Sequence, residues 1–159
     1  MKTVWLPALG AIVSFAVVAS AHGQERQLPD GRFTLFAGND GGANFIVEGS
    51  QSRSGDKVRV TNYRVYANEI PSPGGPIDQD LTELEIDCAR RSQRILAVHA
   101  FGPTGRWIVS LPAEDERPIE PRQTWDFVAR IVCDGTRLPA DATIDGREAA
   151  RSEARARLG

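Results

Sequence analysis

The chain has 159 residues, of which 41% are hydrophobic and 25% are charged, a size and composition that indicate one globular domain. Its 19 lysines and arginines are balanced by 21 aspartates and glutamates, which gives a formal net charge of −2. Because there is no basic surplus, the composition argues against a nucleic-acid partner.

The beginning of the chain predicts a signal peptide over residues 1–21. Lys2 precedes an apolar run over residues 4–18, and the small residues 19–21 form the A-x-A pattern of a cleavage site. The apolar run is shorter than a bilayer-spanning helix requires. We therefore expect a mature chain that begins near His22, has no membrane span and is exported to the periplasm or the cell surface. A retained N-terminal anchor is the alternative.

Antiparallel strands are expected in the first part of the mature chain. Residues 22–31 carry almost no large apolar side chains and predict a flexible leader. Short runs rich in Phe, Val, Ile and Tyr then alternate with clusters of Gly, Asn, Asp and Ser, which is typical of strands joined by hairpins. About six strands are expected, over residues 32–37, 43–49, 58–67, 81–89, 94–101 and 106–112.

The third of these strands changes parity along its length. Val58 and Val60 share one face, whereas Tyr63 and Val65 share the other. Such a change predicts either a β-bulge or a strand that is partly buried on both sides.

The fourth strand shows the clearest alternation. Its apolar positions are Leu84, Ile86 and Cys88, and the positions between them are acidic, namely Glu83, Glu85 and Asp87. We interpret this strand as half-buried, with the thiol inward and the carboxylates on a solvated face.

A helix is expected after the last strand, over residues 122–133. The spacing i, i+3, i+4, i+7, i+8 places five side chains on one helical face: Trp125, Val128, Ala129, Val132 and Cys133. Pro121 is compatible with the start of this helix, and Gly135 is a stop signal.

The two cysteines of the chain, Cys88 and Cys133, favour a structural disulfide. Neither has a C-x-x-C partner, and in an oxidising compartment two lone thiols of a small domain are usually bridged. The bond would tie the end of the helix to the inward face of the fourth strand. The expected fold is therefore α+β: an antiparallel sheet of about six strands, with a C-terminal helix packed on one face and tethered by a disulfide.

Residues 32–135 form the expected domain, and residues 136–159 are expected to be a mobile charged tail. The tail holds few large apolar side chains, and its Ala/Arg/Glu stretch has too narrow an apolar stripe to dock strongly.

Several motifs of the domain resemble the surface-adhesin E-like family of proteobacterial exported proteins. The strand ending in "EIDC" is followed by the basic segment "ARRSQR", the turn "GPTG", the strand "RWIVS", the approach "RPIEP" and the helix ending "FVARIVC". The upstream segment "ANFIVEGSQSRSGDKVRVTNYRV" also resembles the early strands of that family. The resemblance covers residues 33–133.

The resemblance implies a six-stranded sheet with one disulfide to a C-terminal helix, and it carries over residue by residue only to Cys88 and Cys133. It also implies a non-catalytic surface or envelope protein that binds extracellular or host matrix proteins and forms a homodimer. No motif of this chain can be assigned to adhesion.

The chain carries no recognisable catalytic motif, so we expect neither an enzyme nor a cofactor. The candidate binding residues are the local basic cluster Arg90, Arg91 and Arg94, which suits an acidic partner; a solvated turn is the alternative. Aromatic candidates are Tyr63, Tyr66, Trp107 and Trp125, for which a core position is the alternative.

A periplasmic small-ligand or copper-binding protein is the alternative function. Cleavage after residue 21 would expose His22 as the N-terminal residue, and its amine and imidazole could bind copper together with His99. Against this, His99 lies in the middle of a predicted strand, where a histidine with satisfied hydrogen bonds is more common.

Overall fold

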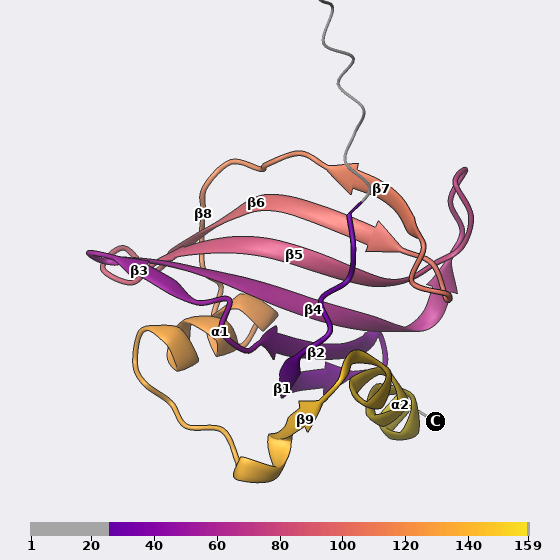
Figure 1. Cartoon of the computed structure of the whole chain (residues 1–159). Helices are drawn as coiled ribbons and strands as arrows, with labels where there is room; N and C mark the ends of the chain where they lie inside the picture. The colour runs from indigo at the N-terminus through magenta and orange to yellow at the C-terminus, as the bar shows by residue number, and fades with distance from the viewer. Residues whose placement is uncertain (1–25, 159) are drawn as a thin grey trace, which may run out of the picture.

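A computed structural model describes residues 26–158 of the chain. The predicted signal peptide, His22 and the start of the predicted leader lie outside these residues. Within them the chain forms a nine-stranded antiparallel sheet, two α-helices and a short 3-10 helix (Figure 1). The elements are β1 (Arg32–Asn39), β2 (Gly42–Val47), β3 (Ser52–Ser54), β4 (Lys57–Ile70), β5 (Ile77–Asp87), β6 (Ser92–Phe101), β7 (Trp107–Leu111), β8 (Arg117–Pro118), α1 (Thr124–Val132), η1 (Ala140–Ala142), β9 (Thr143–Asp145) and α2 (Arg147–Leu158).

The strand order is β7-β6-β5-β4-β2-β1-β9, with β3 paired to β4 and β8 paired to β6. The six predicted strands correspond to β1, β2, β4, β5, β6 and β7, and the predicted α+β fold class is confirmed. Strands β3, β8 and β9 were not predicted because each has only two or three residues and none shows an alternating apolar pattern.

Strand β4 is buried on both sides, and this explains its change of parity. Val58 and Val60 belong to a cluster with Val128 and Val132 of α1, whereas Tyr63 and Val65 belong to a second cluster that contains two alanines of α2. The register of β4 against β5 is continuous from residue 57 to residue 65. Since no bulge intervenes, successive side chains point to opposite faces, and α1 and α2 cover opposite faces of the sheet.

Helix α2 and strand β9 correct the expectation of a mobile tail over residues 136–159. Strand β9 pairs with β1, and the α2 side chains of Ala150 and Ala154 are fully buried. Two arginines of α2 also hold one buried carboxylate: Arg151 and Arg155 donate to Asp78 at 2.7 and 3.1 Å. The docking depends on this distant acidic partner, which the composition of the tail does not reveal.

The predicted disulfide is confirmed between Cys88, which directly follows β5, and Cys133, the C-cap residue of α1. The two Cα atoms lie 5.5 Å apart. Because position 88 has the parity of Ile86 and Leu84, the bond lies on the sheet face that α1 covers. The end of the helix is therefore tied to the strand beneath it, as predicted.

Candidate functional site

Each helix covers only part of one sheet face, so part of each face remains for polar side chains. Helix α1 lies near the β3 end of β4, and α2 lies near its other end (Figure 1). At the end of β4 where α1 lies, the odd-numbered side chains of β4 and β5 point to the opposite face, which α2 covers only at the other end; they include Lys57, Arg59 and Glu85.

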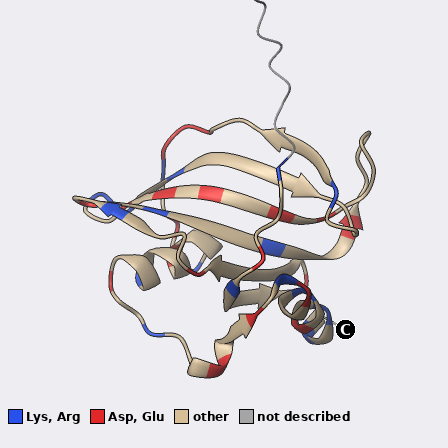
Figure 2. Cartoon of the chain, viewed as in Figure 1, with Lys and Arg blue, Asp and Glu red and all other residues tan. Residues whose placement is uncertain are grey.

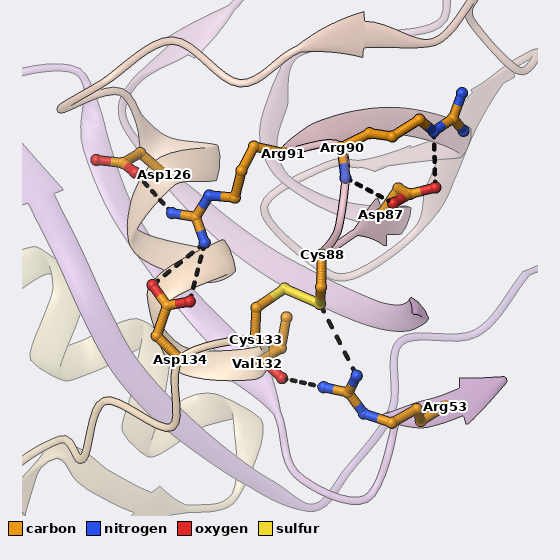
Figure 3. The surroundings of a disulfide bond; sticks show 9 residues. All are labelled: Arg53, Asp87, Cys88, Arg90, Arg91, Asp126, Val132, Cys133 and Asp134. Atoms are coloured by element: carbon orange, nitrogen blue, oxygen red, sulfur yellow. Dashed lines mark hydrogen bonds and ion pairs between the residues drawn. A yellow bond between two sulfur atoms is a disulfide. The ribbon is translucent and has the colours of Figure 1, made fainter. Parts of the chain in front are cut away.

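The structure does not bring the three predicted binding arginines together. Arg90 donates to Asp87 from its backbone N and its Nε, both at 2.9 Å, and its Nη2 lies 2.8 Å from Glu116 Oε1. Figure 3 shows Arg90 and Arg91 pointing in different directions from the turn between β5 and β6. Of the predicted cluster, Arg90 binds Asp87 and Glu116, and Arg94 lines a separate groove.

Arg91 connects the turn to α1 beside the disulfide. Its Nη1 lies 3.1 Å from Asp134 Oδ1, and its Nη2 lies 3.4 Å from Asp126 Oδ1 (Figure 3). The backbone N–H of Arg122 and then the Arg130 guanidinium lower the pKa of Asp126, against the effect of its partial burial. Arg91 therefore supports the covalent link between the turn and the helix.

Arg94 belongs to a groove of about 640 Å³, which we call the cationic groove. Its lining residues come from β3, β4, β5 and β6 and are Ser52, Arg53, Ser54, Lys57, Arg59, Glu85 and Arg94. Three of its cationic side chains, Lys57, Arg59 and Arg94, contact one carboxylate. Figure 2 shows basic segments of β3 and β4 beside acidic segments of β5 at this end of the sheet.

Glu85 is the centre of the cationic groove. Its Oε1 accepts from Lys57 Nζ at 3.0 Å and from Arg94 Nη2 at 3.3 Å, and its Oε2 accepts from Arg59 Nε at 3.2 Å. The Lys57 hydrogen bond lowers the pKa of Glu85, burial opposes it, and the Arg59 hydrogen bond lowers it further. The carboxylate is 9% exposed, so the expected solvated acidic face is incorrect at this position.

The three cations around Glu85 remain accessible to a ligand. The side chains of Lys57, Arg59 and Arg94 are 45%, 63% and 43% exposed. Each guanidinium has five donors in a planar fork, and among the described residues Arg59 uses only its Nε. Arg53 lies at the edge and donates from Nη2 to the carbonyl of Val132 at 2.6 Å (Figure 3). The groove can therefore offer charged donors to an anion.

Sequence reasoning missed Arg53, Lys57 and Arg59 because they are dispersed along the chain. Cross-strand register places Arg59 opposite Glu85, and Glu85 opposite Arg94. The available signal was the alternation of Lys57 and Arg59 with Val58, which marks one exposed basic face of a strand.

His99 is a buried histidine with both ring nitrogens in hydrogen-bonding range of a partner. Nδ1 lies 2.8 Å from Ser110 Oγ, and Nε2 lies 3.2 Å from Glu83 Oε1. His22, the other residue of the copper alternative, lies outside the described residues. Across residues 26–158 no group of three or more His, Cys, Asp or Glu side chains is placed to hold a metal ion.

The aromatic candidates lie in three different environments. Tyr63 is a core residue with no exposed surface. Tyr66 and Trp125, by contrast, are only partly buried and line a hollow on the face that carries α1. Trp107 is partly buried and packs against the cluster under α2.

The chain was compared with protein-family models, curated proteins and solved structures, and none of the three comparisons gave a match. Neither α1 nor α2, the helices of the described region, is long and apolar enough to cross a membrane. The disulfide is compatible with an oxidising compartment.

Proposed function

We propose that the protein is an exported, non-catalytic binding protein of the surface-adhesin E-like type. Its partner is an extracellular or envelope protein that presents an acidic segment to the cationic groove. The observation that carries the proposal is the groove itself: the three cationic side chains of Lys57, Arg59 and Arg94 surround the Glu85 carboxylate on a sheet face that neither helix covers there.

The charge distribution of the groove supports an acidic partner. Glu85 neutralises one of the three cations that contact it, and the remaining excess favours acidic side chains of a ligand. Guanidinium groups also bind carboxylates through two parallel hydrogen bonds, which adds geometric specificity. Such exposed charges increase the rate of association more than the affinity, so binding should weaken as salt is added.

The groove can be tested with the purified protein and a fluorescein-labelled, glutamate-rich peptide. Fluorescence anisotropy should show binding at low ionic strength that weakens at high ionic strength. The double variant Arg59→Gln/Arg94→Gln should bind roughly two- to thirtyfold more weakly, because each of the two exposed charge pairs contributes about 0.2–1 kcal/mol. The matched control is Arg137→Gln, which changes an exposed arginine on the segment between α1 and η1.

Three results would contradict the groove proposal: no binding at low ionic strength, binding that is insensitive to salt, or equal loss in the double variant and the control. Location is tested separately by adding a protease to intact cells, with a periplasmic protein as the marker. Loss of the protein while the marker survives supports a surface location. Protection of both until the outer membrane is permeabilised would contradict the surface role.

A further inference from the structure

A second uncovered area lies on the sheet face that carries α1, beyond the start of this helix. It is a hollow of about 390 Å³, which we call the Asp80 pocket. Its floor is made by even-numbered positions of β2, β4 and β5, namely Asn44, Asn62, Arg64, Tyr66, Asp80 and Thr82. These positions have the opposite parity to Arg59 and Glu85, so the pocket and the cationic groove open on opposite faces of the sheet.

The floor of the Asp80 pocket contains a buried network of polar groups. Asp80 is 3% exposed and accepts from the hydroxyls of Tyr66 at 2.5 Å and of Thr82 at 3.0 Å. The Arg64 guanidinium lies 4.6 Å from the centre of the Tyr66 ring. Burial raises the pKa of Asp80, and the two hydrogen bonds oppose that shift. Two hydroxyl groups thus hold the Asp80 carboxylate, and cross-strand register places Arg64 opposite Asp80.

Some of the hydrogen-bonding capacity of the floor is unused within the described residues. Asn62 is 2% exposed and donates to Asn44 at 3.4 Å, but its own Oδ1 has no partner, and Arg64 Nε has none either. Buried polar atoms without partners are uncommon in folded proteins. Helix α1 begins at the same pocket, and its N-cap residue Gln123 makes no side-chain capping bond. An acceptor and a donor without partners therefore lie buried in the floor of the pocket.

The rest of the pocket lining is mainly apolar, with Gln123 and Thr124 at the start of α1 as its polar members. Trp125 and Val98 line it, and Leu111, 52% exposed, stands at its rim. Small-molecule sites combine such walls with a few convergent polar groups, and their volumes are about 300–1,000 Å³. The Asp80 pocket fits a ligand of about the size of one sugar ring.

We infer that the Asp80 pocket binds a small, uncharged, polyhydroxylated ligand, such as a monosaccharide or one sugar unit of a glycan. The formal charges of Asp80 and Arg64 cancel, which suits a ligand without net charge. Each hydroxyl group both donates and accepts, so it can match the carboxylate and the Asn62 oxygen as well as the guanidinium and the helix N–H groups. The rings of Tyr66 and Trp125 provide surfaces for the C–H faces of a sugar.

Isothermal titration calorimetry of the purified protein tests this inference. The probes are glucose, galactose, mannose and N-acetylglucosamine, with alanine and leucine as amino-acid comparators. At least one sugar should bind with a Kd of about 1 mM or tighter, and neither amino acid should bind. Asp80→Asn should weaken sugar binding by at least roughly tenfold, because a hydrogen bond to a charged group is lost. The exposed Asp141→Asn is the matched control and should leave the Kd unchanged.

A second variant keeps the test decisive if Asp80→Asn unfolds. Leu111→Arg places a long side chain at the rim of the pocket, where the native residue is exposed and the core is not disturbed. It should abolish sugar binding without changing the circular dichroism spectrum. The absence of any sugar with a Kd of about 1 mM or tighter, binding of the amino acids alone, or sugar binding that survives Leu111→Arg would overturn the inference. Loss of binding to the glutamate-rich peptide is not expected in either variant, so this test is independent of the cationic groove.

Discussion

Removing the disulfide with the double variant Cys88→Ser/Cys133→Ser should strongly destabilise the protein. The bond joins residues 45 positions apart, and closing a loop of this length restricts the unfolded chain by about 4 kcal/mol at 25 °C in the chain-entropy model. For a domain of this size, 1 kcal/mol corresponds to about 3–4 °C in Tm. We therefore expect Tm to fall by about 12–16 °C. Changing both cysteines avoids a free thiol that could form bonds between molecules.

Contacts beside the bond are independent of it. Arg91 pairs with Asp134 and Asp126, and Arg53 donates to the carbonyl of Val132, so the end of α1 keeps non-covalent anchors in the variant. Because these contacts are the same with and without the bond, the expected loss comes from the restriction of the unfolded chain.

The assay is thermal unfolding followed by circular dichroism, without reducing agent, after mass spectrometry has shown that the wild-type cysteines are oxidised. The wild type in excess reducing agent is the control and should melt at nearly the temperature of the variant. A fall in Tm of less than about 3 °C would refute the conclusion that the loop constraint stabilises the fold.

Two further predictions concern α2 and acid stability. Asp78→Asn should release α2, because Arg151 and Arg155 lose their charge partner and the apolar contact of this helix is small. Trypsin should then cleave the chain at these two arginines faster than it cleaves the control variant Asp115→Asn, which changes an exposed carboxylate. Tm should also decrease as the pH falls below about 4.5. The pKa of Glu85 is lowered in the folded state, so its ionised form contributes its full stabilisation above about pH 4.5 and loses it as the pH falls through the folded-state pKa. Glu85→Gln should reduce this pH dependence of Tm, and an identical dependence in wild type and variant would contradict the assignment.

Local periodicity was sufficient to predict much of the fold. The alternation around Cys88 predicts a half-buried strand, and the spacing from Trp125 to Cys133 predicts one helical face, because each pattern depends only on neighbouring residues. The parity change in β4 already indicated burial on both sides as one of two alternatives, and the two helices on opposite faces account for it.

Polar sites were much less predictable than apolar faces. Of the predicted arginines, Arg94 lies in the cationic groove, whereas Arg90 and Arg91 make ion pairs within the turn and with α1. The sequence predicted one basic cluster because Arg90, Arg91 and Arg94 are close together in the chain. In the structure its members diverge, since neighbouring residues of a turn and a strand point in different directions.

The sequence by itself determined the strand pattern, the helix before Cys133 and the pairing of the two cysteines. Tertiary structure alone decided where charges meet: Arg59 and Glu85 are 26 positions apart, and Arg151 and Asp78 are 73 apart. It also decided that α2 docks and that Asp80 lies buried beside Arg64. The physical reason is that apolar burial leaves a periodic trace in each segment, whereas ion pairs and pockets depend on the register between segments that are distant in the chain.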